Sequence, residues 1–475
     1  MKRFAVFTSF LLLAVSLSVA ETPVERYGQL AVKGNRLVSK STGKPVQLRG
    51  MSYFWSMAGE ARDYYNADVV NTLVTDWKIN VIRAAMGVDE KWNDVSQGYL
   101  AGDKSGSVSN KKRVFDVADA AIAKGIYFIV DWHSHTANDH TNEAKVFFEE
   151  MATKYKDKPN VIYEIFNEPI NGGTGVSSAN YWGNTVKPYS QTIVNAIRAI
   201  DPNNVIIIGT PTWSQDVDIA TANPVEGEHL VYSLHFYSLN HKEPIRTKGR
   251  TALSRDKAIF VSEFGVCGSG GSGDLALDEA TKWLNFLDSN KVSWVNWSIC
   301  NKAETASALK PGTPTNGIWT DANITESGKY VRGKLIEAYN REESNTATLV
   351  TDLVVPNAKQ PNESTAIAPV AAVSNIFSVG PVPASQSGNG VKFFWQGKAV
   401  AGGSLLIYDA LGNSVKTINV TAAPSGNLSK RTIGSWDLTD ANGRRAAAGS
   451  YLVKGKVVTQ NGNAVIVSSM IVVGN

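Results

Sequence analysis

The sequence predicts a (β/α)8 barrel followed by a small all-β sandwich. Eight short apolar segments typical of strands alternate with helix-like segments between residues 46 and 297. The helix-like segments include KKRVFDVADAAIAKG and DEATKWLNFLDSN. Eight β-then-α units in one region of this size fit a closed barrel better than an open sheet. After residue 376 only strand-like segments follow, which indicates a second domain of another class.

The predicted barrel strands are regularly spaced along the chain. They span residues 46–51, 81–85, 126–131, 161–166, 205–209, 230–235, 259–263 and 292–297. Ahead of the first strand, QLAVKGNRLVSKSTGKPVQL is typical of a hairpin that turns at Gly34-Asn35. We expect this hairpin to close the floor of the barrel.

The first twenty residues have the pattern of a signal peptide. Lys2 and Arg3 precede an apolar run over residues 4–15, and small residues follow up to Ala20, where we expect cleavage. The alternative is a membrane anchor, but the apolar run is shorter than the roughly 20 residues that span a bilayer. The sequence therefore predicts an exported protein without membrane insertion, secreted or bound to the cell surface, with the periplasm as an alternative.

Composition excludes some partners. The formal charge of +4 includes Lys2 and Arg3, and without these two residues it is +2. Such a small excess gives no reason to expect nucleic acid or an anionic membrane as a partner. The two cysteines, Cys267 and Cys300, do not make a disulfide-built scaffold. They follow adjacent predicted strands, so they either pair in an exported protein or remain free buried thiols.

A change of composition marks the domain boundary. Residues 341–372 are rich in Thr, Asn, Ala and Pro, which predicts a linker between a domain over residues 21–340 and one over 373–475. In the second domain, Phe393 and Trp395 alternate on one strand face, and Trp436 and Tyr451 lie elsewhere. These aromatics form either a sugar-binding platform or the core of a sandwich, and alternation favours the core.

Polar residues collect at the ends of the predicted strands, where the active site of a (β/α)8 barrel forms. The segment VIYEIFNEPI is an apolar strand that ends in Asn167, Glu168 and Pro169, although a carboxylate there is costly to desolvate. The other strands bring further polar and aromatic residues to the same end. The whole ring is Arg83, His133, Asn167, Glu168, Trp213, His235, Tyr237, Glu263 and Trp297.

This ring suits hydrolysis of a glycosidic bond. One carboxyl group can protonate the leaving oxygen, while the other stabilises or captures the sugar cation. Tryptophan rings can stack on the apolar faces of pyranoses. Taken singly, a buried histidine is more often a core residue and a tryptophan is more often packing, but the joint arrangement favours an active site.

Several of these segments resemble the motifs of glycoside hydrolase family 5, and most of all its bacterial endo-β-1,4-glucanases. The segments are NVIRAAM, VDWH, FNEP, HFY, SEFG and VNWS, and the resemblance covers about residues 27–340. It implies a retaining mechanism on β-1,4-glucan, with Glu168 as general acid/base and Glu263 as nucleophile. Burial and the charge of Glu263 are expected to raise the pKa of Glu168.

The resemblance also implies supporting roles for neighbouring residues. Asn167 is expected to hydrogen-bond the sugar 2-hydroxyl group. Arg83 and Tyr237 are expected to keep Glu263 ionised and oriented. The residues that would shape the same pocket are His133 and His235.

Further sugar contacts are expected on both sides of this pair. Trp213 resembles an aromatic residue that stacks on a leaving-group sugar, and Trp297 is a second candidate. In CNKAETASAL, Lys302 and Glu304 either contact sugar hydroxyls, as a similar segment does in bacterial endoglucanases, or belong to a solvated loop. In GMSYFWSM, Tyr53 stands where relatives often have a histidine, and nearby Trp55 is the candidate contact at the distal subsites.

The sequence offers weak signals for a metal or a nucleotide. DWHSHTANDH contains His133, His135 and His140, but the first belongs to the ring and the others lie on a polar loop. GSGGSG at residues 268–273 is no phosphate loop, because no Gly-Lys-Ser/Thr follows, and it predicts a loop at the rim of the cleft. We therefore expect no metal and no cofactor.

Other functions remain open at this point. The same ring could serve a β-mannanase or a xyloglucanase, because the cleft loops select the sugar. A non-catalytic glucan-binding protein is a third possibility, which the presence of both Glu168 and Glu263 disfavours. We expect a monomer. The segments SLLIYDALGNSV and WDLTDANGRRAAAGSYLVKGKV are similar to FlgD-type immunoglobulin-like modules.

Overall fold

The computed structural model describes residues 21–353 and 376–474, apart from short gaps at 93–94, 103–108, 172–174, 381–383, 386–389, 398, 410–413, 423–425 and 461–463. The predicted signal peptide lies outside the described residues. The chain divides into two compact units, Met1–Glu343 and Ser344–Asn475. Among the described residues, no helix combines the length and the apolar character needed to span a bilayer.

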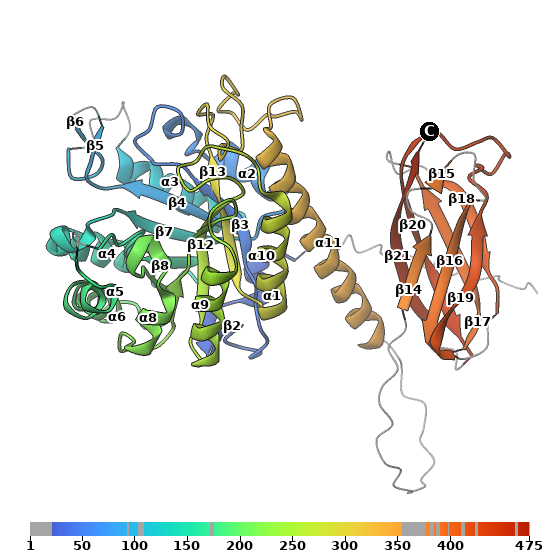
Figure 1. The fold of residues 1–475 in the computed structure, drawn as a ribbon, viewed down its shortest axis with the longest axis horizontal. Helices are drawn as coiled ribbons and strands as arrows, with labels where there is room; N and C mark the ends of the chain where they lie inside the picture. The colour runs from blue at the N-terminus through green and yellow to red at the C-terminus, as the bar shows by residue number, and fades with distance from the viewer. Residues whose placement is uncertain are drawn as a thin grey trace, which may run out of the picture. The chain divides into compact units, whose positions relative to one another are not determined.

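The first unit is a closed barrel of parallel strands, as predicted (Figure 1). Each strand pairs with the next in the order below, and β13 pairs with β3 to close the ring. The short β11 (Phe236–Tyr237) extends the β10 side of the ring against β12. The barrel strands are β3 (Arg49–Tyr53), β4 (Val81–Gly87), β7 (Tyr127–His133), β8 (Val161–Glu164), β9 (Ile206–Ile208), β10 (Leu230–Ser233), β12 (Ile259–Gly265) and β13 (Ser293–Ile299).

Helices follow the strands and cover the barrel. Their N-termini are capped where the sequence supplies a short polar side chain: Asn66 accepts from the Val69 amide in α2, and Ser109 accepts from the Lys112 amide in α3. The main helices are α2 (Ala67–Thr75), α3 (Asn110–Ala123), α4 (Thr141–Tyr155), α6 (Lys187–Arg198), α8 (Val217–Ala222), α9 (Glu243–Ser254), α10 (Leu277–Asn290) and α11 (Glu326–Leu353). Shorter turns of helix are α1 (Pro23–Tyr27), α5 (Ser178–Tyr181), α7 (Pro211–Ser214), η1 (Arg62–Tyr64), η2 (Ala137–His140) and η3 (Trp182–Val186).

Alternation along the strands separates two hydrophobic clusters. In β7, Tyr127 and Ile129 belong to a cluster inside the barrel, whereas Phe128, Val130 and Trp132 belong to the cluster between strands and helices. This follows from the two-residue period of a strand. The barrel interior is thus apolar at the start of the strands, and only positions nearer their carboxyl ends remain for polar side chains.

The predicted hairpin closes the apolar end of the barrel. Strands β1 (Leu30–Lys33) and β2 (Arg36–Ser39) pair antiparallel, and Gly34 has the positive φ of 60° that a tight hairpin turn requires. Leu30 and Leu37 are buried in the same cluster as the inward residues of the barrel strands. The hairpin is therefore the floor beneath the site.

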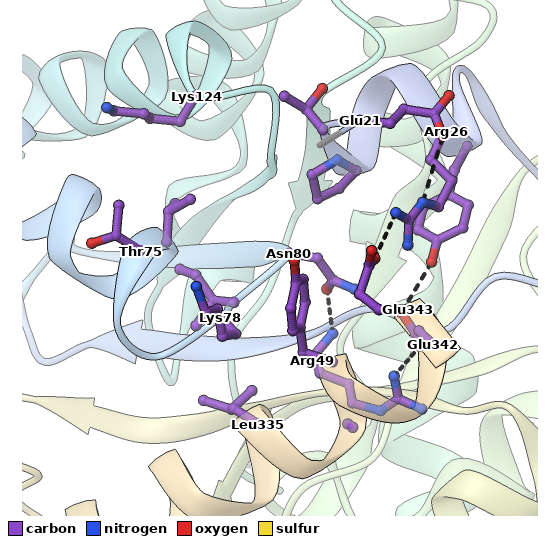
Figure 2. A pocket seen from close by; sticks show the side chains of 17 residues that line it. Glu21, Arg26, Arg49, Thr75, Lys78, Asn80, Lys124, Leu335, Glu342 and Glu343 are labelled. Carbon is purple, nitrogen blue, oxygen red and sulfur yellow. Dashed lines mark hydrogen bonds and ion pairs between the residues drawn. The ribbon is translucent and has the colours of Figure 1, made fainter. Parts of the chain in front are cut away.

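The same end of the barrel holds the beginning and the end of the first unit. Figure 2 shows the pocket between them, where Arg26 of α1 pairs with Glu343 at 2.6 Å and Arg49 pairs with Glu342 of α11. Arg341 also pairs with Asp288 at 2.6 Å. Helix α11 continues to Leu353, so residues 341–353 of the predicted linker are helical, and the two units divide after Glu343. These ion pairs hold a segment whose composition resembled a linker, and residues 354–372 of that prediction lie outside the described residues.

Beyond the end of α11, the elements described in the second unit are all strands. One sheet has β14 (Ile376–Gly380), β16 (Val391–Gly397) and β19 (Gly426–Trp436). The other has β15 (Ala384–Ser385), β21 (Ala464–Gly474), β20 (Gly449–Thr459), β17 (Val400–Tyr408) and β18 (Ser414–Val420). The four aromatics considered above as a sugar platform are buried in one core, which confirms their assignment to the interior. They are Phe393, Trp395, Trp436 and Tyr451.

The two cysteines are free. Cys267 and Cys300 are both buried in one hydrophobic cluster. The thiol of Cys300 lies 3.1 Å from the Ser307 hydroxyl and 3.7 Å from that of Ser298. Of the two alternatives, the structure has free buried thiols and no disulfide.

Candidate active site

Strand alternation places a layer of polar side chains above the apolar interior. Val81 on β4 belongs to the inner cluster, so Arg83, two residues later, points into the barrel as well. The same spacing from Ile129 directs Asp131 inward on β7, and from Ile162 it directs Glu164 inward on β8. All three polar side chains are completely buried.

Arg83 is the centre of this layer. Its Nε lies 2.7 Å from Glu164 Oε2, its Nη2 lies 2.9 Å from Asp131 Oδ2, and its Nη1 lies 3.0 Å from Glu263 Oε2. Nη2 also donates to Asn167 Oδ1 at 2.7 Å. One guanidinium group thereby orients the candidate nucleophile and the asparagine beside the candidate acid, because its five donors have a fixed geometry.

Burial sets the charges around Arg83. Burial lowers the pKa of Arg83, but the carboxylates of Asp131, Glu164 and Glu263 outweigh it and raise the pKa. His133 Nδ1 lies 2.5 Å from Asp131 Oδ2. Burial raises the pKa of Asp131, although Arg83 opposes the shift, and burial together with Arg83 lowers the pKa of His133. His133 therefore contributes shape and a hydrogen bond to the pocket and carries no charge.

Sequence reasoning missed Asp131 and Glu164. Both belong to the predicted apolar strands 126–131 and 161–166 and precede the candidates His133 and Glu168; in the structure Asp131 lies within β7 and Glu164 is the last residue of β8. The signal was present, because each is a lone acidic residue at an inward position of an otherwise apolar strand. Such a residue needs a buried partner.

Glu263 reaches the site through an irregularity in β12. The pairing of β12 with β13 shifts between Val261 and Phe264, both of which belong to the outer cluster. The shift allows Ser262 and Glu263 both to face the interior, as a bulge does. Tyr237 donates to Glu263 Oε1 at 2.8 Å, and Arg83 holds the other oxygen. Burial and the charge of Glu168 raise the pKa of Glu263.

Glu168 follows β8 and accepts hydrogen bonds from two histidines. His235 Nδ1 lies 2.9 Å from Oε1, and His135 Nε2 lies 3.3 Å from Oε2. Burial raises the pKa of Glu168, but the two hydrogen bonds outweigh it and lower the pKa to about 2. The expected upward shift is therefore absent from the resting site, because both carboxylate oxygens accept from a histidine.

His135 is the second residue that sequence reasoning missed. It was assigned to a polar loop, whereas its ring lies between Glu168 and Glu90, whose Oε1 is 3.5 Å from Nδ1. Burial lowers its pKa, but the two carboxylates raise it to about 10, and partners of the same kind raise that of His235 to about 9. Nothing in the sequence indicated that the loop folds back over Glu168. His140 instead pairs with Asp89 at 2.7 Å.

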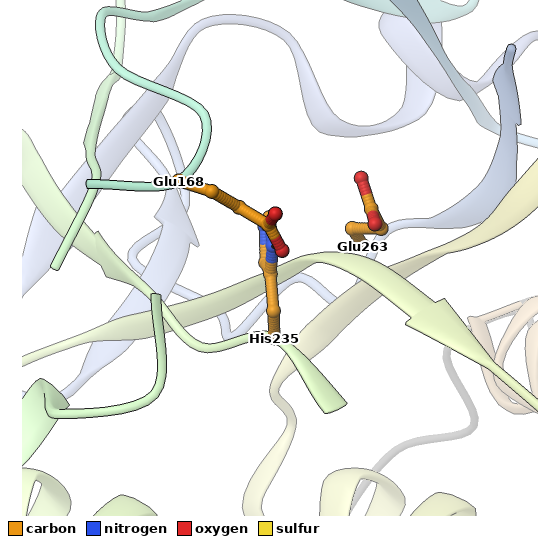
Figure 3. Close-up of side chains that lie close together, drawn as sticks. All are labelled: Glu168, His235 and Glu263. Carbon is orange, nitrogen blue, oxygen red and sulfur yellow. The ribbon is translucent and has the colours of Figure 1, made fainter. Parts of the chain in front are cut away.

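The two candidate catalytic carboxylates face each other across the site. Figure 3 shows Glu168 over His235, with Glu263 opposite, and each of the three offers an oxygen or nitrogen atom within 4.8 Å of the others. This separation is close to the 5–5.5 Å typical of retaining glycosidases and well below the roughly 6.5–9.5 Å of inverting ones. The same three atoms could also hold a metal ion, so the expected absence of a metal stays a prediction.

The pair lies where two cavities meet. Both cavities are lined by Glu168, Tyr237, Glu263 and Ser269. One extends to Trp213, whose side chain is 48% exposed. The other extends to Trp55, Trp297, Lys302 and Glu304, and the loop at 269–271 forms part of its wall. All five candidate sugar contacts therefore line the cavities that flank the carboxylates.

The second cavity is ordered by contacts among its own residues. The Trp297 ring stacks on His133 at 5.2 Å between centroids, and the Trp55 ring meets the same histidine edge-on at 4.1 Å. Lys302 Nζ pairs with Glu304 at 2.5 Å. Tyr53 is buried and stacks on Tyr65 at 4.4 Å, outside both cavities. Trp55 is thus the residue of this segment that faces the cleft.

A (β/α)8 barrel with two facing carboxylates at the ends of β8 and β12 is the architecture of a glycoside hydrolase. The profile described as "Cellulase (glycosyl hydrolase family 5)" matches residues 39–303. The chain belongs to this family.

Similar proteins agree with this assignment. An endoglucanase of Clostridium saccharobutylicum is 42% identical over 330 residues, which cover 68% of each chain. Endoglucanase 5 of Pectobacterium carotovorum subsp. carotovorum is 36% identical over 440 residues, or 90% of this chain and 83% of that protein. The catalytic domain of Thermobifida fusca endoglucanase Cel5A, in complex with cellotetraose, is 32% identical with a TM-score of 0.58. The match covers 66% of this chain and 99% of that one.

Proposed function

We propose that the protein is a retaining endo-β-1,4-glucanase in which Glu168 is the general acid/base and Glu263 is the nucleophile. The observation that carries the proposal is the Glu168–Glu263 pair, with oxygens within 4.8 Å, where two cavities meet. That spacing leaves too little room for a water molecule to attack between the carboxylates, so one of them attacks the sugar directly.

In the first step Glu263 attacks the anomeric carbon while Glu168 protonates the leaving oxygen. A covalent glycosyl-enzyme forms on Glu263 and the glycosidic C–O bond breaks. Tyr237 and Arg83 hold the two oxygens of Glu263, which fixes the attacking lone pair. In the resting site the proton that Glu168 must donate resides on His135 or His235, and it moves to Glu168 when sugar enters.

In the second step Glu168 acts as a base. It removes a proton from a water molecule, whose oxygen attacks the anomeric carbon and releases Glu263, so the β-configuration is retained. Asn167 uses its Oδ1 to accept from Arg83, which orients its amide N–H groups toward a sugar 2-hydroxyl. That hydrogen bond strengthens as the oxocarbenium-like transition state forms.

The two cavities are the arms of an open cleft on either side of the scissile bond. We assign Trp213 to the arm that holds the leaving-group sugar, and Trp55, Trp297, Lys302 and Glu304 to the opposite arm. The exposed Trp213 ring and the cavity-lining rings of Trp55 and Trp297 suit pyranose stacking. The Lys302–Glu304 pair offers polar atoms to hydroxyl groups. A cleft open at both ends accepts the interior of a polysaccharide, which fits endo cleavage. The cellotetraose complex of the Thermobifida fusca relative supports a β-glucan substrate.

The remaining proposals concern the second unit and the location of the protein. We assign the all-β unit to the FlgD-type immunoglobulin-like modules and expect it to serve export, attachment or spacing. We expect a monomer that is exported after cleavage at Ala20 and then acts outside the cytoplasm.

Substrate comparison tests the function. Carboxymethyl cellulose, glucomannan and xyloglucan are assayed in parallel, with reducing ends and viscosity followed together. The proposal predicts preferred turnover of carboxymethyl cellulose, with viscosity falling early, because internal bonds break. Preference for glucomannan or xyloglucan would assign a different glucan, and binding without turnover would leave only a glucan-binding protein. NMR of the first products should show the β-anomer.

A further inference from the structure

The loop after β9 (Ile206–Ile208) has an unusual backbone. Three consecutive residues that are not glycine, Thr212, Trp213 and Ser214, have φ values of 59°, 53° and 56°. L-amino acids avoid this left-handed region because Cβ approaches the carbonyl oxygen, and they enter it as single residues far more often than in runs. Such a conformation persists only where surrounding contacts impose it, and it clusters at functional sites.

One set of contacts ties this turn to the segment that carries Glu168. The Trp213 amide donates to the Pro169 carbonyl at 3.1 Å, and the Ser214 hydroxyl donates to the Asn167 carbonyl at 2.7 Å. The His235 amide donates to the Ser214 carbonyl at 2.7 Å. The left-handed turn is therefore fastened on both sides to residues of the active site, and Trp213 is exposed between them.

A second set of contacts stabilises the turn through the carboxylate of Asp216. Its Oδ2 accepts from the Thr212 hydroxyl at 2.6 Å and from the Ser178 hydroxyl at 2.5 Å, and its Oδ1 accepts from Lys248 Nζ. Ser178 begins α5 and Lys248 lies on α9, so one carboxylate joins three separate segments. Asp216 is only 7% exposed. Burial raises its pKa, but Lys248 and the two hydroxyl groups lower it below the ordinary value.

We propose that Asp216 and Lys248 are positioning residues for the leaving-group sugar, because they impose the left-handed turn that presents Trp213 to the cleft. Neither residue lines the cavities around the carboxylates. Their effect passes through Thr212 to the direction of the Trp213 ring. This inference rests on the proposed placement of Trp213 and adds to it the contacts that fix the direction of that ring.

The test compares two substrates. Cellohexaose uses the leaving-group arm, whereas 4-nitrophenyl β-cellobioside makes little use of it. Asp216→Asn and Lys248→Met should each lower kcat/KM on cellohexaose by roughly 10-fold to 100-fold, since small misplacements of a positioning group cost this much. Turnover of the aryl cellobioside should change by less than about threefold, which is well below that misplacement cost. Lys248→Arg keeps the cation and should restore most of the cellohexaose activity.

Two controls make the result specific. Lys145→Met removes a lysine from an exposed pair with Glu149, at 3.6 Å on α4, and should change neither substrate. Trp213→Ala should itself lower cellohexaose turnover selectively, and in that background Asp216→Asn and Lys248→Met should add little, because the ring they position is gone.

The outcomes distinguish the placement of Trp213 in the leaving-group arm from the positioning role of Asp216 and Lys248. If Trp213→Ala lowers both substrates equally, the placement of Trp213 fails and this inference fails with it. If Trp213→Ala is selective but Asp216→Asn and Lys248→Met are not, only the inference is overturned. Full additivity of Lys248→Met with Trp213→Ala also overturns it. Should Asp216→Asn fail to fold, Lys248→Met alone decides, because its side chain is partly exposed and it leaves Asp216 with its two hydroxyl donors.

Discussion

His135 Nε2 lies 3.3 Å from Glu168 Oε2, and its Nδ1 lies 3.5 Å from Glu90 Oε1. The histidine therefore connects the candidate acid/base to strand β5 (Glu90–Trp92) in the loop that follows β4. Besides these two carboxylates, His133 interacts electrostatically with His135. His133 is uncharged, and the Trp55 ring meets it edge-on. With the pKa of Glu168 lowered to about 2 and that of His135 raised to about 10, the shared proton rests on the histidine.

His135→Asn should shift the alkaline limb of kcat/KM to lower pH. In the unchanged enzyme the shared proton stays available until His135 loses it near pH 10. In the variant only Glu168 and His235 can hold the proton, and the pKa of His235 is about 9. A pH profile on an aryl cellobioside from pH 4 to 11 measures the shift. An unchanged or raised alkaline limb would contradict the role of His135 as the proton store.

Stability provides an independent check on the same histidine. The pKa of His135 is raised from 6.5 to about 10, so its contribution to stability is complete below pH 6.5 and is lost as the pH rises through 10. His135→Asn should therefore lower Tm at pH 6, and the difference from the unchanged protein should disappear above pH 10. His140→Asn is the matched control at the other histidine of this loop, since its partner is Asp89 and not Glu168. It should leave the pH profile unchanged.

Arg83→Met should lower the free energy of unfolding by about 3–5 kcal/mol, because it leaves several buried carboxylates without their counter-ion. The carboxylates are those of Asp131, Glu164 and Glu263. Arg332→Met is the control, because Arg332 pairs with Asp321, whose side chain is 81% exposed, and such pairs contribute less than about 1 kcal/mol. Urea denaturation measures both. Equal losses in the two variants would show that the buried cluster is not the source of stability.

The end of the catalytic unit can be located by truncation. A chain that ends at Leu353 should retain the stability and the soluble-glucan turnover of the full protein. A chain that ends at Asn340 loses Glu342 and Glu343, which pair with Arg49 and Arg26, and should be less stable by roughly 1.5–3 kcal/mol. Thermal unfolding of the two truncated proteins makes the comparison. If they unfold at the same temperature, the last turns of α11 contribute nothing to the barrel.

The second unit should not bind cellulose through these aromatic residues, because their rings form its core. Phe393, Trp395 and Trp436 are each at most 2% exposed. We expect no saturable binding when isolated residues 376–474 are mixed with microcrystalline cellulose and pelleted. The catalytic unit ending at Leu353 serves as the positive control. Saturable pelleting of the second unit would make it a carbohydrate-binding module after all.

Most of the barrel could be predicted because strand patterns and chain order determine it. The strand-end rule then located Glu168, Glu263, Arg83 and His133. The rest depended on contacts that leave little local signal. Asp131 and Glu164 belong to the apolar strands themselves, and the partnership of His135 with Glu168 requires a loop to fold back. The hydrogen bonds from His135 in that loop and from His235 reverse the expected direction of the Glu168 pKa shift.

The end of the helix was missed for a related reason. Residues 341–343 have the polar composition of a linker, and only their ion pairs with Asp288, Arg49 and Arg26 show that they belong to the barrel. Those partners are distant in sequence, so composition alone could not identify them. The left-handed turn at Trp213 is another feature that the sequence did not predict, since the residues PTWS include no glycine that would indicate a positive φ.

Azide rescue tests the roles of the two carboxylates most directly. Glu168→Ala should still form the glycosyl-enzyme from an aryl cellobioside, because the leaving group needs no proton, but its hydrolysis should be slow. Added azide should accelerate turnover and give the β-cellobiosyl azide, identified by NMR. Glu263→Ala should be rescued only to the α-azide, because azide then attacks from the vacated nucleophile side. A β-azide from Glu263→Ala together with an α-azide from Glu168→Ala would show that the two roles are reversed.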